Sequence, residues 1–410
     1  MEEEPEQKII KYISSQCGIS VDEYKKLERA VSGNQNDLTL QGLDISKEMK
    51  KSTSNIRLLT GIQELDNLTG GLRAGVNVIS GFRKCCKSTF ALNLVYRALN
   101  DGMNVCLLSL EMTKADVINM LISLHSFELD PKTAITRDEI ENCYNNSRDK
   151  YNDYLNSFFS LPGNLIIYTE DDIKEYNEAN FDEKFNSANK CFIRKNNKIT
   201  DLLVVDNINC IRLWEKSTGE KAYTNASNYF RKVSLSFGIS KQGYDLKPVI
   251  CLLLCQINRA GGKDAGYLGF YPESCIAETV NIERDATTII PIYVNPKGDR
   301  KEALIKLEVS RYSKPMDNEV SVPMVLKYGK IGPQITKINI DQSKIKLIEE
   351  SLNYKREYIE CGDFRMKIIY PKNKSKEELK KVGIKTLHYE NDEEYEIEYE
   401  LFERRKYEWY

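Results

Sequence analysis

The chain has 410 residues, of which 41% are hydrophobic and 29% are charged. This composition is typical of a folded globular protein and argues against wholesale disorder or a fibrous structure. The 59 Lys and Arg residues nearly balance the 61 Asp and Glu residues, which leaves a net charge of -2. A protein that coats nucleic acid through bulk positive charge is therefore excluded, and any such binding requires a local patch.

The N-terminal sequence MEEEPEQ is acidic and has no apolar core, so we expect no secretory signal. No run of about 18 apolar residues is present, so we expect no transmembrane helix and no membrane partner. The 11 cysteines are scattered without CxxC spacing, which favours a reduced, cytoplasmic protein. The two histidines, His125 and His388, are far apart, which argues against a His-rich metal site or a Ser-His-Asp triad.

Residues 1–55 predict a short N-terminal helical arm and linker. Apolar residues recur at helical spacing in two patches, 9–13 and 24–31, and residues 34–51 are polar. This arm is too short for an independent enzyme domain, so we interpret it as a docking or packing segment.

Residues 56–338 predict an α/β core domain. Short apolar runs alternate with longer amphipathic stretches, which is typical of a mainly parallel sheet with helices on both faces. The polar stretch 142–197, apart from one strand inside it, is expected to be an insertion or an irregular connection. We expect strands at 76–79, 105–108, 165–168, 202–205, 248–254, 287–294 and 303–309, and helices at 88–99, 114–124 and 222–239.

Residues 339–410 predict a small α+β C-terminal module. Helices are expected at 344–354 and 375–382, and strands at 365–370 and 395–401. The last strand is rich in glutamate. Its acidity is compatible with a solvated strand face, and also with a charged partner or an autoinhibitory tail.

The sharpest motif is GFRKCCKS at 81–88, placed between a strand and a helix. It follows the phosphate-loop pattern G-x-x-x-x-G-K-[ST], in which backbone N–H groups and the helix N-terminus surround phosphates. Lys87 would neutralise the outer phosphates and Ser88 would ligate Mg²⁺. Cys86 stands where the second glycine belongs, so its Cβ either strains the loop or crowds the phosphate. The predicted nucleotide-binding residues are Gly81, Lys84, Cys85, Cys86, Lys87, Ser88 and Thr89.

Three polar side chains follow later strands in the order that such a site requires. Glu111 follows the second strand and could polarise a water for attack on a γ-phosphate. Asp206 ends an apolar strand, where it could hold Mg²⁺, and Gln256 ends another, where it could sense the γ-phosphate. Since the carboxyl ends of parallel strands share one edge, these residues should meet there. Each alone is also compatible with a helix cap or a solvated group.

With these motifs in place, the chain resembles the ATPase domain of DnaB-type replicative DNA helicases over about residues 56–335. The Ser-Leu-Glu-Met and Gln-x-Asn-Arg segments are quite specific among RecA-like ATPases. The segments that carry the resemblance are GIQELD at 61–66, GGLRAG at 70–75, the phosphate loop with TFALN at 89–93, SLEM at 109–112, Asp206, CQINR at 255–259, NIERDA at 281–286 and RYSKP at 311–315.

The resemblance implies a RecA-like P-loop NTPase that assembles as a ring, usually a hexamer, with ATP and Mg²⁺ between neighbours and single-stranded DNA in the centre. It implies that Glu111 is the catalytic base, that Asp206 and Ser88 hold the metal, and that Gln256 is the γ-phosphate sensor. Arg311 would be the arginine finger offered to the neighbour's nucleotide. The predicted DNA-binding residues are Arg259 and Lys263.

The chain also departs from this family. The family usually has a lysine two residues before the finger, where this chain has Val309, and the family's larger N-terminal domain has no counterpart in residues 1–55. A phage, plasmid or mobile-element relative of the helicases fits better than a standard bacterial enzyme, with replication or mobile-element proteins as partners. A RecA-like nucleotide switch or weak ATPase without strand separation remains the alternative. A binding protein with a degenerate nucleotide site is a third hypothesis, and the joint presence of five site side chains argues against it: Lys87, Ser88, Glu111, Asp206 and Gln256.

Overall fold

The computed structural model describes residues 20–21, 56–173, 175–235, 248–257, 280–295 and 300–346, together with three strands between 354 and 388. The chain divides into two units, Met1–Asn55 and Ile56–Tyr410. The helical patches predicted in the arm, the helix at 375–382 and the strand at 395–401 lie outside the described residues, apart from residues 20–21. No helix in the described ranges is long and apolar enough to cross a bilayer.

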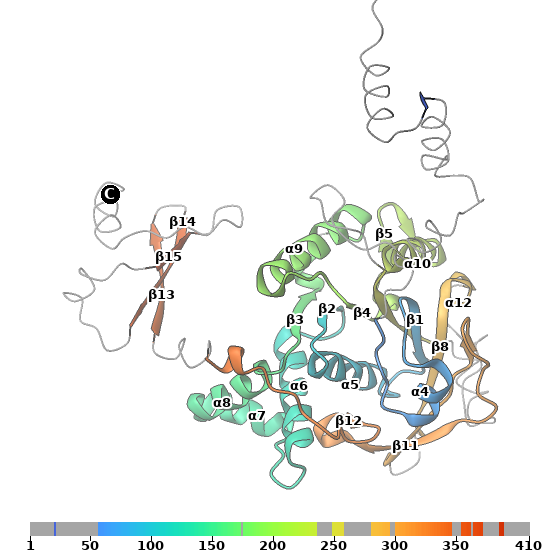
Figure 1. Cartoon of the computed structure of the whole chain (residues 1–410), viewed down its shortest axis with the longest axis horizontal. Coiled ribbons are helices and arrows are strands. Elements are labelled where there is room, and N and C mark those ends of the chain that lie inside the picture. The colour runs from blue at the N-terminus through green and yellow to red at the C-terminus, as the bar shows by residue number, and fades with distance from the viewer. Residues whose placement is uncertain are drawn as a thin grey trace, which may run out of the picture. The chain divides into compact units, whose positions relative to one another are not determined.

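A ten-stranded sheet forms the centre of the described core (Figure 1). Its order is β12-β11-β9-β8-β1-β7-β4-β2-β3, and β10 pairs with β8. The strands from β8 to β3 run parallel, and the others add antiparallel pairs. The mainly parallel sheet expected from the sequence is therefore confirmed. The strands are β1 (Gly75–Gly81), β2 (Asn104–Ser109), β3 (Asn164–Thr169), β4 (Leu202–Asp206), β7 (Ile250–Gln256), β8 (Ala286–Tyr293), β9 (Glu302–Ile305), β10 (Val309–Ser310), β11 (Val320–Val325) and β12 (Lys330–Ile331).

Helices cover both faces of this sheet (Figure 1). Because side chains alternate along a strand, neighbouring residues of β4 belong to two different cores: Leu202 and Val204 pack in one cluster, and Leu203 and Val205 in the other. The first cluster contains residues of α5 (Lys87–Asn100), α6 (Lys114–Leu129), α7 (Arg137–Asn146) and α8 (Arg148–Phe159), and the second those of α9 (Glu178–Asn196) and α10 (Glu220–Leu235). The remaining elements of the core are α4 (Gln63–Thr69), α12 (Val280–Asp285), the hairpin β5 (Leu213–Trp214) and β6 (Ser217–Thr218), and single 3₁₀ turns at Glu170–Asp172, Ile208–Cys210 and Leu326–Tyr328.

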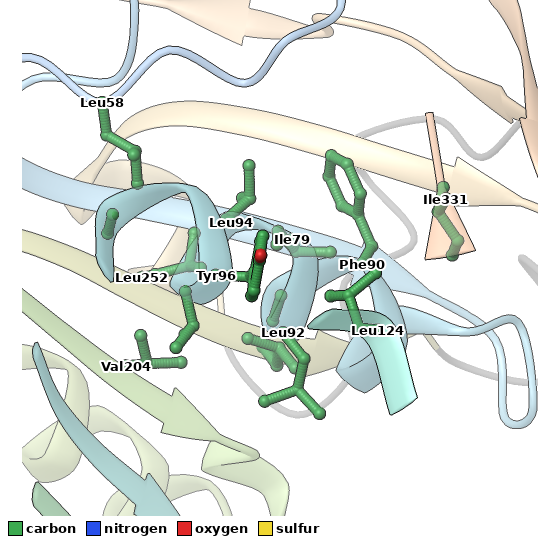
Figure 2. Close-up of a cluster of buried hydrophobic side chains, with 14 of the residues drawn as sticks. Leu58, Ile79, Phe90, Leu92, Leu94, Tyr96, Leu124, Val204, Leu252 and Ile331 are labelled. Carbon is green, nitrogen blue, oxygen red and sulfur yellow. The ribbon is translucent and has the colours of Figure 1, made fainter. Parts of the chain in front are cut away.

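Helix α5, which follows the phosphate loop, is buried along most of its length. Phe90, Leu94 and Tyr96 are each at most 1% exposed. In the close-up they lie among Ile79 of β1, Leu252 of β7 and other apolar residues (Figure 2). Burial of an apolar side chain of this size contributes about 1.5–3 kcal/mol. The start of this helix is thus held in place by the centre of the core.

The expectation of an irregular connection over 142–197 is wrong, because the segment contains α8 and α9. Asn177 caps α9 by accepting a hydrogen bond from the backbone N–H of Asn180 (2.8 Å). Phe181 and Phe185 of this helix are buried in the second cluster. Three buried aromatic rings at spacings of four and seven are enough to form a core face, although the intervening residues are polar.

The single strand expected at 303–309 is also corrected, because it is split into β9 and β10. Between them the backbone N–H of Leu307 points to the sulfur of Met316 (3.4 Å), and its carbonyl accepts from the Met316 N–H (2.9 Å). On either side of Leu307, the backbone N–H groups of Lys306 and Glu308 still donate to carbonyl oxygens of β8. The strand is divided because the pairing register shifts by one residue: Ile305 lies opposite Ile292, whereas Val309, four residues later, lies opposite Ile289, only three residues away.

The described part of the C-terminal module is an antiparallel three-stranded sheet. It consists of β13 (Tyr354–Cys361), β14 (Phe364–Pro371) and β15 (Lys385–His388), in that order. The strand expected at 365–370 lies within β14. The prediction of a helix at 344–354 is wrong at its C-terminal end, because Tyr354 begins β13. Residues 342–346 are helical.

Candidate nucleotide-binding site

The parallel strands bring the phosphate loop, Glu111, Asp206 and Gln256 to one edge of the sheet. In the register of β1 and β7, Gly81 lies opposite Gln256, and in that of β2 and β4, Ser109 lies opposite Asp206. A pocket of about 840 Å³ opens at this edge. It is lined by Arg83, Lys84, Cys85, Cys86, Lys87, Ser88, Thr89, Glu111, Asn209, Cys210, Arg212, Tyr223, Gln256 and Arg300.

The phosphate loop keeps the backbone shape that its motif requires, although Cys86 replaces the glycine. Cys86 has φ 67° and ψ 26°, in the left-handed region that favours glycine. A left-handed conformation costs an L-residue roughly 1–2 kcal/mol. Of the two consequences expected from the sequence, loop strain is therefore present. The first glycine is required, because a Cβ on Gly81 would clash with the Cys85 sulfur and lie 2.8 Å from the Ile292 carbonyl oxygen.

Lys87, the first residue of α5, is 8% exposed. Its ammonium donates to the carbonyl oxygens of Gly81 and Phe82, at 3.1 Å each. Burial raises the pKa of the neighbouring Cys85 thiol to about 11, so this thiol is neutral at pH 7 and does not offset the lysine charge. The loop thus combines a lysine with the N-terminus of a helix, an arrangement that suits an anion.

Asp206 lies behind the loop, 3% exposed, and its Oδ1 has no hydrogen-bond partner among the described residues. Burial raises the pKa of this carboxyl group to about 6, the Ser88 hydroxyl opposes the rise, and the charge of Glu111 adds to it. A buried carboxylate with an unused oxygen, beside a hydroxyl, is a fitting donor set for Mg²⁺, which prefers oxygen ligands. The residues present therefore fit the divalent ion that phosphate-loop proteins use.

Glu111 is exposed in the pocket and is oriented by residues that follow β4. The Asn207 side-chain amide donates to its Oε1 at 2.6 Å, and the Cys210 thiol lies 3.8 Å from the same oxygen. The other carboxylate oxygen is not used by these two contacts. A carboxylate held in this way can accept a proton from a water molecule.

Gln256 reaches the pocket from the end of β7. Its backbone N–H donates to Asn209 Oδ1 at 2.7 Å, and its side-chain oxygen accepts from the Nε of Arg83 at 3.2 Å. The residue is therefore tied both to the segment after β4 and to the phosphate loop. This position lets it respond to changes at either one.

Arg311 lies apart from this pocket. It is exposed and is not among the residues that line it. Its guanidinium donates to the carbonyl oxygens of Ala286 (2.9 Å) and Arg284 (2.6 Å). The two residues predicted to bind DNA, Arg259 and Lys263, lie outside the described residues.

Several residues that line the pocket, or that hold its side chains as Asn207 holds Glu111, were not predicted from the sequence. Asn207, Asn209 and Cys210 directly follow Asp206, so the rule that strand ends gather at one edge could have identified them. Arg83 lies inside the motif, at a position where the pattern allows any residue. Arg300 lies far along the chain in a segment without a motif, and no sequence signal indicates its place.

The parallel sheet, the phosphate loop after its first strand and the polar strand ends define a RecA-like P-loop NTPase core. The profile of the DnaB-like helicase C-terminal domain family matches residues 57–322. The chain belongs to this family.

A search of characterised proteins finds the replicative DNA helicase DnaB of Helicobacter pylori, 30% identical over 152 residues. The match covers 32% of this chain and 31% of that relative. Among solved structures, a DnaB-like replicative helicase described with its interactions with primase has a TM-score of 0.53 and 17% identity. The alignment covers 79% of this chain and 74% of that solved chain. Another solved ATPase domain has a TM-score of 0.53 and 18% identity. The alignment covers 71% of this chain and 96% of that solved chain. These structures support the fold.

Proposed function

We propose that this chain is an ATP-dependent DNA helicase or single-stranded DNA translocase of the DnaB type, acting in the cytoplasm. The observation that carries the proposal is the pocket itself. The phosphate loop retains its left-handed turn at Cys86, and it faces Glu111 and Gln256. Membership of the DnaB-like family supports the choice of a helicase over other nucleotide hydrolases.

Each side chain then has a task in the hydrolysis of ATP. Lys87 exchanges its contacts with the loop carbonyls for the outer phosphates, and Ser88 and Asp206 hold Mg²⁺. When bound, this ion neutralises charge on the phosphates. Glu111 takes a proton from the attacking water, and Gln256 contacts the γ-phosphate.

We further propose that the active form is a ring, hexameric by resemblance, with the nucleotide between neighbouring subunits. This is supported by Arg311, which lies outside its own pocket and is therefore available to a neighbour's nucleotide. In the same proposal, Arg259 and Lys263 contact the backbone of single-stranded DNA. Replication or mobile-element proteins would be its partners.

Steady-state ATP hydrolysis by the full chain tests the proposal. We expect turnover that requires Mg²⁺ and rises with single-stranded DNA. Lys87→Ala should abolish both nucleotide binding and turnover, whereas Glu111→Gln should abolish turnover but keep binding. Lys132→Ala, a change of an exposed lysine elsewhere in the core, serves as the control. Wild-type turnover by Glu111→Gln would contradict the assigned base.

A nucleotide switch without strand separation is the second candidate, and Cys86 favours it. The Cβ and thiol of Cys86, at the place of the second glycine, could crowd the phosphates and so slow turnover or weaken binding. Binding of ATP together with background turnover, at every DNA concentration, would select this function over the helicase.

A further inference from the structure

Arg300 reaches the phosphate loop from a distant part of the chain, between β8 and β9. One of its terminal nitrogens donates to the Lys84 carbonyl oxygen at 2.8 Å and contacts the Cys86 sulfur at 3.4 Å. The residue is exposed and lines the same pocket as Lys87 and Ser88. Arg300 thus joins the three basic residues of the loop at the pocket, Arg83, Lys84 and Lys87.

Among the described residues, the contacts of Arg300 provide no counterion for its charge. Both involve one nitrogen, whereas a guanidinium has five N–H donors in a planar fork. A carbonyl oxygen and a thiol are neutral partners, and burial raises the pKa of the Cys86 thiol, which favours its neutral form. The described residues give Arg300 no carboxylate within ion-pair distance. An arginine in this situation is suited to a phosphate group, which it can bind through two parallel hydrogen bonds.

Cys86 explains how the arginine is held there. A glycine at this position would offer no side chain, whereas the thiol supplies a contact for the guanidinium directly above the loop. The same substitution that strains the backbone therefore brings a cation to the pocket.

We propose that Arg300 is a phosphate-binding residue for the nucleotide of its own subunit, held over the loop by Lys84 and Cys86. This inference rests on the proposed function, because it requires a nucleotide in the pocket. It differs from the role proposed for Arg311, which would act on the nucleotide of a neighbour.

Equilibrium titration of the full chain with a fluorescent N-methylanthraniloyl derivative of ATP, in the presence of Mg²⁺, tests the proposal. A hydrogen bond to a charged group contributes about 1.5–3 kcal/mol, so Arg300→Ala should weaken binding about tenfold to a hundredfold. Arg300→Gln, which keeps hydrogen-bond donors but loses the charge, should weaken it similarly. Arg300→Lys should retain more affinity than Arg300→Gln. Lys301→Ala, which removes the adjacent exposed charge, should stay within about twofold of wild type.

Two results would overturn the assignment. Wild-type affinity in Arg300→Ala would show that the residue does not contact the nucleotide. Wild-type affinity in Arg300→Gln would show that it only fastens the loop through neutral hydrogen bonds. The Lys87→Ala variant separates this failure from that of the proposed function. If Lys87→Ala loses binding while Arg300→Ala retains it, only the inference about Arg300 is wrong, and if the wild type binds no nucleotide, the proposed function is wrong as well.

Discussion

The left-handed backbone at Cys86 predicts an unusual order of stability for two small substitutions. Cys86→Ala and Cys86→Gly both remove the thiol, and they differ only by the Cβ. At φ 67° the Cβ costs roughly 1–2 kcal/mol, while glycine costs about 0.5–1 kcal/mol in chain entropy. The glycine variant should therefore be the more stable of the two by about 0.5–1 kcal/mol. Because 1 kcal/mol shifts the Tm of a large domain by roughly 2–4 °C, its Tm should be about 1–4 °C higher.

Thermal unfolding of the two variants, followed by circular dichroism without nucleotide, measures this difference. Ala98→Gly is the matched control, because Ala98 lies buried inside α5, where glycine should lower stability by about 1 kcal/mol or more. If Cys86→Ala were as stable as Cys86→Gly, or more stable, the loop would not have the left-handed turn, and the reasoning about strain would be refuted.

Three further predictions concern other parts of the core. Burial lowers the pKa of His125 to about 4. The same imidazole in the unfolded chain binds a proton near pH 6.5. The free energy of unfolding should therefore fall by about 3 kcal/mol as the pH drops from about 6.5 to about 4. Urea unfolding across this range should therefore show a flatter pH dependence for His125→Gln than for wild type, and equal slopes would contradict the assignment. Lys330 and Glu128 form a buried ion pair, so Lys330→Met should lower the free energy of unfolding by about 3–5 kcal/mol. If urea unfolding showed a smaller loss for this variant than for a variant of an exposed lysine, the ion pair would be dispensable. If Arg311 acts on a neighbour's nucleotide, mixing Arg311→Ala with Lys87→Ala subunits should restore part of the ATPase activity that each lacks alone, and a mixture without activity would count against that role.

The strands, and the site residues that follow them along the chain, could be predicted because their sequence signals are local. Strand β4 is a run of apolar residues ended by a carboxylate, and the parallel arrangement then places Asp206 beside the phosphate loop. Helix α9 was missed for the opposite reason. Its large buried side chains are three phenylalanines among asparagine, lysine and glutamate. Only packing against the sheet makes that face part of the core.

The contacts that complete the pocket could not be predicted, because they join segments that are far apart in the sequence. The hydrogen bond from Asn207 to Glu111 and that from Arg300 to Lys84 depend on strand order and on loop paths. The sequence also left open which consequence Cys86 would have, since a strained loop and a crowded phosphate begin from the same Cβ. The backbone angles of Cys86 show the strained loop.

A structure of the full chain with Mg²⁺ and a non-hydrolysable ATP analogue would show whether the loop still binds a nucleotide with Cys86 in place of its second glycine. We expect a triphosphate along residues 81–88, with the Lys87 ammonium moved from the carbonyl oxygens of Gly81 and Phe82 to the phosphates. A loop that excludes the analogue while Lys87 keeps both carbonyl contacts would contradict it.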